Sequence, residues 1–344
     1  MNQMFNAMNT VAAASSTLME AGIAHGIGPG EESLTDVNLI QLCQLIPSLR
    51  VKKFGKTEEA GNGADWEWWI GSFEDRWIQL RIQAKRSSHD GRKYEHLGYT
   101  TEGRTEKQYD VLITKSLIEG AIPFHVFFNG WPEDRYLVKD LHHDVIARDR
   151  RAGRDVFLPS SVWDSRHWGC TIASTDTVKT IYEDPKKSGF PRSMLTGWQA
   201  KGKLYVPHYL THSTPWSHLF YSSNTGRTPT VREVAQNLHR LQGKDGVLTD
   251  EEFLDMTHPQ PSSSAEAAAY GQFTLRKAIT SEQDRTRPSR DRERAQDFIS
   301  SIESPSDLSH LLEDPDGEES EPAYRLLLDL DPENSPFFNE NYQG

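Results

Sequence analysis

The chain of 344 residues contains little cysteine and lacks any long apolar run. Its two cysteines, Cys43 and Cys170, show no paired spacing, so they predict two ordinary buried thiols in a reducing, cytoplasmic compartment. A disulfide or a zinc site is not expected. No apolar stretch reaches the roughly 18 residues that a membrane-spanning helix needs. Residues 1–28 contain no Lys or Arg, which argues against a secretory signal and against a transit peptide.

Several common catalytic signatures are missing as well. The chain has no glycine-rich phosphate loop and no Gly-x-Ser-x-Gly elbow. Four histidines come into consideration as metal ligands: His142, His143, His208 and His212. Their spacing does not give a ligand pair on a convincing helix, so we expect them at exposed loop positions. Any catalytic chemistry has to come from a different set of side chains.

The excess of negative over positive charge lies at the C-terminal end of the chain. The whole sequence has a formal net charge of −12, but residues 244–344 carry 23 Asp or Glu against 9 Lys or Arg. The rest of the chain holds 27 acidic and 29 basic side chains, with local basic clusters. Because phosphate binding depends on local positive potential, the global charge does not exclude nucleic acid as a partner.

Two neighbouring segments, residues 63–70 and 77–86, predict adjacent strands with polar chemistry at one end. Side chains alternate across a strand, so the polar residues share one face. On the first strand this face carries Asp65, Glu67 and Trp69, and on the second it carries Gln79, Arg81, Gln83 and Lys85. Oxygen ligands from carboxylates hold hard cations, and a neighbouring lysine can orient or polarise an attacking water. The two strands therefore predict a site for metal-assisted hydrolysis.

The surrounding pattern predicts the order helix, three strands, helix and strand. A capping-box-like start at Ser33–Asp36 opens an amphipathic helix, and Arg50–Glu59 is expected as the first strand, followed by a glycine turn. The second helix is predicted over about Thr105–Glu119, with Gly120 as its C-cap. The last strand of this order is expected at Ile122–Asn129.

The composition divides the chain into three parts. Residues 1–28 are expected to be an N-terminal extension. Residues 29–243 are expected to form an α/β domain with a C-terminal helical extension, which closes with a helix near Gly243. Residues 244–344 are predicted to be an acidic, largely disordered linker and tail, because they are polar, rich in charge and carry only isolated apolar residues.

This ordered set of motifs resembles the PD-(D/E)XK nuclease superfamily, whose members share a restriction endonuclease-like αβββαβ core with a mixed central sheet. The resemblance rests on Asp65, on Gln83-Ala84-Lys85 at a spacing of 18 residues from that aspartate to the glutamine, and on a glutamate in the first helix. It covers roughly residues 30–220. More narrowly, the chain is similar to an uncharacterised bacterial family of that superfamily through Gly63–Trp68, Gln83–Arg86, Tyr94, Gln108, Pro123–Asn129 and Gly169-Cys170.

The resemblance implies a Mg²⁺ or Mn²⁺ site and assigns roles to individual residues. The catalytic residues would be Glu32, Asp65, Gln83 and Lys85, with Glu32, Asp65, Gln83 and Glu67 as metal ligands. Glu31 is an adjacent alternative to Glu32, and the sequence leaves that choice open. In the superfamily, the position of Gln83 is more often occupied by a carboxylate, so the glutamine lowers the negative charge of the site by one. Glu67 or Glu59 could restore that charge. Gln108 is expected as a supporting polar residue early in the second helix.

The activity implied by the resemblance is hydrolysis of phosphodiester bonds in nucleic acid, with DNA as the expected substrate and phage defence or restriction as the expected role. Basic side chains around the loop after the second site strand are expected to bind nucleic acid: Arg86, Arg92, Lys93, Arg104 and Lys107. The alternative is an inactive module that kept the fold and binds nucleic acid or a protein, which the uncharged Gln83 favours. No membrane is expected, and a homo-oligomer is left open.

The acidic tail is expected to bind either a protein partner or its own nuclease domain. By Coulomb attraction it could compete with phosphate for the basic loops at Lys85–Lys107 and Arg148–Arg154, and salt would weaken that competition. On this interpretation, truncation near residue 258 should tighten nucleic-acid binding and raise cleavage.

Overall fold

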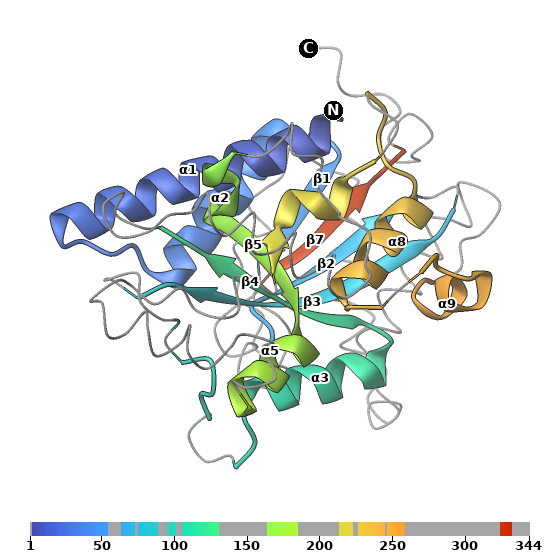
Figure 1. Ribbon diagram of the computed structural model, residues 1–344. Coiled ribbons are helices and arrows are strands. Elements are labelled where there is room, and N and C mark those ends of the chain that lie inside the picture. The colour runs from blue at the N-terminus through green and yellow to red at the C-terminus, as the bar shows by residue number, and fades with distance from the viewer. Residues whose placement is uncertain are drawn as a thin grey trace, which may run out of the picture.

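The computed structural model describes residues 2–53, 63–72, 75–88, 94, 96–100, 105–130, 164–184, 213–222, 226–244, 246–258 and 324–331. Within these ranges the chain is a mixed α/β protein in which helices cover both faces of a seven-stranded sheet (Figure 1). The strand order across the sheet is β1-β7-β2-β3-β4-β5-β6. None of the described helices is long and apolar enough to cross a membrane.

The sheet is mixed in strand direction. Its strands are β1 (Leu49–Lys53), β2 (Trp66–Gly71), β3 (Trp77–Arg86), β4 (Ile122–Phe128), β5 (Cys170–Ser174), β6 (Thr214–Pro215) and β7 (Tyr324–Asp329). β2 and β3 run antiparallel, with Trp66 opposite Ile82, whereas β3 and β4 run parallel, with Gln83 opposite His125. β5 pairs antiparallel with both β4 and β6.

The helices of the described ranges are α1 (Gln3–His25), α2 (Glu31–Leu45), α3 (Gln108–Glu119), α5 (Thr175–Glu183), α8 (Val231–Leu241) and α9 (Asp250–Asp255), with two 3-10 helices, η3 (Ser165–Gly169) and η5 (Trp216–Phe220). The predicted order of helix, three strands, helix and strand is therefore confirmed as α2, β1, β2, β3, α3 and β4. α3 ends as expected, because Gly120 adopts the left-handed conformation and donates its N–H to the carbonyls of Ser116 and Leu117.

The predicted start of the first core helix is wrong by a few residues. α2 begins at Glu31, with Gly30 as its N-cap, so Ser33 and Asp36 lie inside the helix and do not form a capping box. A glycine at the N-cap supplies no side-chain hydrogen bond, and tertiary contacts position the helix instead. The shift brings Glu31 and Glu32 into the first turn of the helix.

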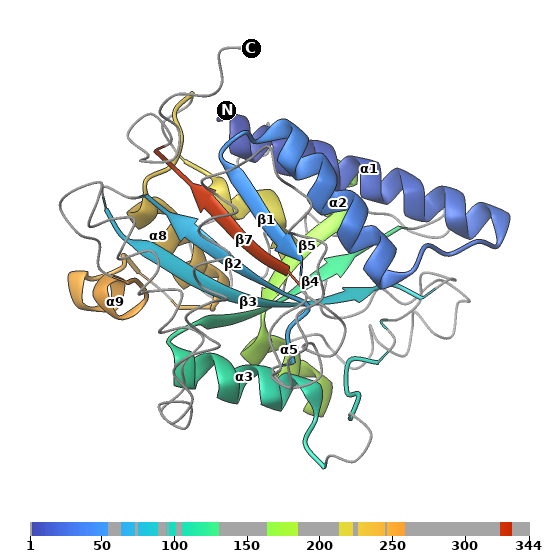
Figure 2. The ribbon, with the colours of Figure 1, turned by 180° about the vertical axis from the view of Figure 1, so that it is seen from behind.

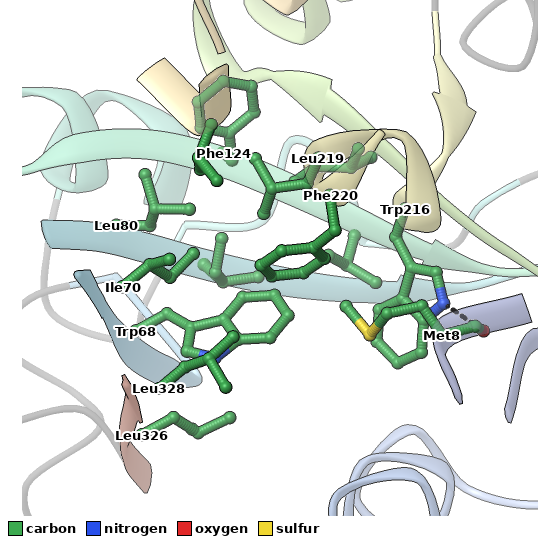
Figure 3. Packing of buried hydrophobic residues seen from close by; sticks show 14 of the residues in the cluster. Met8, Trp68, Ile70, Leu80, Phe124, Trp216, Leu219, Phe220, Leu326 and Leu328 are labelled. Carbon is green, nitrogen blue, oxygen red and sulfur yellow. Dashed lines mark hydrogen bonds between the residues drawn. The ribbon is translucent and has the colours of Figure 1, made fainter. Parts of the chain in front are cut away.

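One face of the sheet packs against a hydrophobic core under α1, α2, η5 and α8. Figure 3 shows strand side chains meeting η5 and α1 in this core: Trp68, Ile70, Leu80 and Phe124 against Trp216, Leu219, Phe220 and Met8. The indole Nε1 of Trp216 donates to the carbonyl oxygen of Met8 over 2.8 Å. α3 and α5 cover the opposite face of the sheet (Figure 1). The polar side chains of β3 lie on this face, because they alternate along the strand with the residues of the core.

The predicted N-terminal extension is part of this domain. In α1 the side chains of Met8, Val11 and Ala12 are fully buried. The helix lies so close to η3 that a Cβ atom at Gly169 would come within 2.1 Å of the Ala12 carbonyl oxygen. Next to this contact, burial raises the pKa of the Cys170 thiol to about 12, as expected for an inert buried thiol.

The segment 324–329, assigned to the tail by its composition, instead forms β7 in the sheet. It pairs antiparallel with β1 and parallel with β2, so these two strands are not neighbours as the expected turn implied. Leu326 and Leu328 are fully buried in the core. Residues 246–258 of the same predicted tail contain α9 and end at His258, which bridges to Trp77 in β3. Short apolar runs identify strands but not their partners, so the sequence could not place β7.

Candidate functional site

Asp65 lies at the end of β3 because β2 and β3 run antiparallel. Its backbone N–H donates to the Ile82 carbonyl over 2.8 Å, and its Oδ2 accepts a 2.5 Å hydrogen bond from the N–H of Ala84. The carboxylate is thereby fixed at the peptide between Gln83 and Ala84. The start of one strand and the end of the next come together as the sequence predicted.

Lys85 forms an ion pair with the first residue of α2. Its Nζ lies 3.2 Å from Oε1 of Glu31, and the N–H of Arg86 donates to the other carboxylate oxygen over 3.1 Å. Lys85 is only 5% exposed. Figure 2 shows α2 beginning near the ends of β3 and β4, which lets the first helical turn reach this lysine.

The structure brings Glu31, and not Glu32, to Lys85. The Glu32 side chain is exposed. Successive residues on an α-helix point about 100° apart, so only one of two neighbouring glutamates can face the end of β3. The choice that the sequence left open therefore falls on Glu31, and the four residues Glu31, Asp65, Gln83 and Lys85 are referred to below as the β3-end site.

Gln83 is fully buried and is oriented by the loop before β2. Its Nε2 donates to the Gly63 carbonyl over 3.1 Å, and its Oε1 has no hydrogen-bond partner among the described residues. Gly63 has a φ of 73°, and a Cβ there would lie 2.8 Å from the carbonyl oxygen of Gln108. Only glycine suits this position. The same contact places the Gln108 backbone, at the start of α3, beside the β3-end site.

Glu67 lies away from this site. It is fully buried and accepts hydrogen bonds from Trp69 Nε1 at 2.7 Å, Gln79 Nε2 at 2.8 Å and Arg81 Nε at 3.4 Å. Residues two apart on a strand share a face but are separated by roughly 6.6 Å, so Glu67 meets Arg81 and not Gln83. The expectation that it restores a charge beside Gln83 is wrong.

The basic residues predicted to bind nucleic acid are only partly described. Arg86 is half-buried at the end of β3. Lys107 lies with its ammonium 5.3 Å and 5.2 Å from the ring centres of Tyr109 and Tyr182, and a hydrogen bond with Tyr109 raises the pKa of this lysine. Outside the described residues lie Glu59, Arg92, Lys93, Arg104 and the cluster at 148–154.

Residues carrying the narrower resemblance form one buried group next to Lys85. The Tyr94 hydroxyl donates to Oδ1 of Asn129, and the Asn129 amide donates to the Trp168 carbonyl over 2.8 Å. The Tyr94 ring packs 4.4 Å from that of Phe127, which is paired with Lys85 across the sheet. This group supports the strand end that carries Lys85.

His125 is a member of the surroundings that the sequence analysis missed. It lies on β4 directly opposite Gln83, and it is fully buried. Its Nδ1 is 3.1 Å from the Thr175 hydroxyl, and its Nε2 has no hydrogen-bond partner within the described part of the chain. A polar residue inside the otherwise apolar run Ile122–Phe128 was the available signal, but its neighbour on β3 cannot be deduced from spacing.

Burial, and to a lesser extent the charge of Lys85, lowers the pKa of His125 from 6.5 to about 3. Because the folded protein keeps this imidazole neutral, the unfolded chain binds an extra proton below pH 6.5. The corresponding stability is complete above that pH and is lost as the pH falls toward 3.

We expect wild-type protein in EDTA to lose about 2 kcal/mol more unfolding free energy than His125→Gln between pH 7 and pH 5. Urea unfolding at the two pH values measures the difference. His25→Gln, which replaces an exposed histidine, should retain the wild-type pH dependence. Equal pH dependence in wild type and His125→Gln would show that the buried imidazole does not titrate as stated.

Within the described ranges, no three side chains of His, Cys, Asp or Glu are grouped as a metal site of those residues alone would require. The oxygen donors at the β3-end site are the Asp65 carboxylate and the Gln83 amide, with Glu31 engaged by Lys85. A cation bound there would have to complete its coordination with water and substrate oxygens, as Mg²⁺ commonly does.

The fold and the site together define a mixed α/β protein with a half-buried Asp and a buried Gln and Lys at the end of a central strand. The chain belongs to a family of unknown function, DUF6615, whose family model matches residues 4–314. No curated protein is significantly similar to it.

Proposed function

We propose that this protein is a metal-dependent nuclease with a restriction endonuclease-like core, and that it hydrolyses phosphodiester bonds in DNA. The observation that carries the proposal is the convergence of Asp65, Gln83 and Lys85 at the end of β3, where Glu31 holds the lysine. The order α2, β1, β2, β3, α3 and β4 supports the same core. Restriction of foreign DNA is the role that analogy with this class suggests.

Asp65 and Gln83 are the residues that we propose to hold the ion. A hard cation prefers oxygen ligands, and the buried Oε1 of Gln83 is an acceptor that needs such a partner. Mg²⁺ often takes only one or two protein ligands and keeps its waters, so this small donor set fits it. When bound, Mg²⁺ or Mn²⁺ would neutralise negative charge on the scissile phosphate.

The protein side chains would supply the remaining chemistry. The Lys85 ammonium would orient the attacking water and stabilise the charge that develops on the phosphate oxygens. Glu31 fixes this ammonium through its 3.2 Å ion pair, and Ala84 N–H fixes the Asp65 carboxylate. The half-buried Arg86 at the strand end is suited to a contact with the DNA backbone.

Incubation of purified protein with supercoiled plasmid tests the proposal. We expect nicking or linearisation with Mg²⁺ or Mn²⁺ and none in EDTA, because hydrolysis depends on the ion at Asp65. Asp65→Asn, which keeps the side-chain size but removes the charge, should lower the cleavage rate by about 100-fold or more. Cleavage that persists in EDTA, or at the wild-type rate in Asp65→Asn, would contradict the proposal.

A second candidate is a nucleic-acid-binding module without catalysis. The uncharged Gln83 favours it, and so does the position of Glu67, because Arg81 binds this carboxylate away from Gln83. In that case gel-shift assays would show DNA binding, while no divalent ion would give cleavage.

A further inference from the structure

Gln83 and His125 lie side by side on β3 and β4, and each has a buried polar atom that lacks a hydrogen-bond partner in the described residues. The two atoms are Oε1 of the glutamine and Nε2 of the histidine. Directly paired residues of neighbouring strands project from the same face of the sheet. The two side chains therefore share the space beneath α3 and α5, next to Asp65 and Lys85.

Among the described residues, Nδ1 is the ring nitrogen of His125 that has a hydrogen-bonding contact. This nitrogen contacts Thr175, which begins α5 directly after β5, and β5 is the neighbour of β4 on the side away from β3. The contact with Thr175 does not use Nε2, which is buried.

A buried polar atom without a hydrogen-bond partner destabilises the fold, so two such atoms on neighbouring strands indicate a common partner. The Gln83 amide oxygen is a hydrogen-bond acceptor. When His125 donates from Nδ1 to the Thr175 hydroxyl, its Nε2 is an acceptor as well. The Asp65 carboxylate at the Gln83–Ala84 peptide adds negative charge to the same place. Three neighbouring acceptors favour a cation as their partner.

We propose that Nε2 of His125 is a nitrogen ligand of the ion held by Asp65 and Gln83, and that it biases this site toward a first-row transition ion such as Mn²⁺ over Mg²⁺. Mg²⁺ takes oxygen ligands almost exclusively, whereas imidazole nitrogen suits transition ions. The inference rests on the proposed function, because it uses the same two oxygen ligands, and it adds the identity of the preferred ion.

Electron paramagnetic resonance of bound Mn²⁺ tests the proposal without any cleavage assay. Titration of the wild-type protein should show Mn²⁺ binding, and pulsed measurements should detect a coupled nitrogen nucleus. In protein grown with ¹⁵N-labelled histidine, the spectrum should show the coupling pattern of ¹⁵N in place of that of ¹⁴N. This measurement needs no substitution, so it remains decisive if a variant at the fully buried His125 fails to fold.

The matched variants are His125→Gln and His218→Gln. His218 is also buried but lies on η5, against Phe5 on the opposite side of the sheet. His125→Gln should lose the nitrogen coupling and bind Mn²⁺ about 10–100-fold more weakly, while Mg²⁺ affinity, measured by competition, changes by less than about 3-fold. His218→Gln should keep the coupling and both affinities.

The possible failures are distinguishable. One outcome is that the wild-type protein binds Mn²⁺, that Asp65→Asn does not, and that no histidine nitrogen coupling is seen. This outcome would overturn the inference and leave the proposed nuclease site intact, with water in place of the histidine ligand. Absence of any Mn²⁺ or Mg²⁺ binding to the wild-type protein would overturn both the inference and the metal-dependent function.

Discussion

A chain that ends before Tyr324 is expected not to fold. Deletion of β7 removes the strand that lies between β1 and β2 and leaves the facing edge of each of them unpaired. It also removes Leu326 and Leu328, which are fully buried in the main core. Replacing one buried leucine by alanine costs about 2–5 kcal/mol, and a whole domain is stable by only about 5–15 kcal/mol.

Circular dichroism and thermal unfolding of the truncated proteins measure this effect. A chain that ends at Asp331 keeps β7 and should melt as the full-length protein does. Leu326→Ala combined with Leu328→Ala in the full-length chain should lower the unfolding free energy by about 4–10 kcal/mol. A cooperative, unshifted transition in the chain lacking residues 324–344 would show that β7 is dispensable for the fold.

The role of β7 changes how autoinhibition by the acidic tail can be tested. Truncation near residue 258 removes β7 together with the acidic residues, so loss of activity in that variant would report unfolding. Substitution of the acidic residues between 303 and 321 by Asn and Gln leaves β7 in place. Tighter DNA binding by that variant at low salt would support the tail as a competitor of phosphate.

Lys85→Met is expected to reduce plasmid cleavage by about 1,000-fold while the protein remains folded. Methionine retains most of the length and the apolar character of the buried stem, but it lacks the ammonium that faces Glu31. Loss of one preorganised charge at a reacting phosphate lowers the rate by about 10²–10³-fold, and loss of water orientation adds to this. Single-turnover cleavage, with thermal unfolding as the control for folding, measures the change.

Two adjacent glutamates provide a matched control for the same site. Glu31→Gln removes the counterion of Lys85 and should lower the cleavage rate by about 10–100-fold. Glu32→Gln changes an exposed side chain one position later and should cleave at the wild-type rate. A loss of activity in Glu32→Gln with full activity in Glu31→Gln would reverse the assignment made from the structure.

The sequence by itself determined the local part of the site. Strand alternation placed Gln83 and Lys85 on one face of β3, and the antiparallel order of two consecutive strands brought Asp65 to the same end. These properties depend on a period of two residues and on a short connection, both of which are visible in the sequence. The end of α3 at Gly120 was determined in the same way, because only the local backbone conformation is involved.

Only the tertiary structure decided which distant residues join that site. Because α2 begins at Glu31, this residue and not Glu32 contacts Lys85. Glu67 forms an ion pair with Arg81 and so lies away from the site. The parallel pairing of β3 with β4 places His125 opposite Gln83. β7 reached its place between β1 and β2 from beyond residue 320. Hydrophobic burial is non-directional and strand pairing is not encoded by local periodicity, so these partners are fixed by the packing of the whole domain.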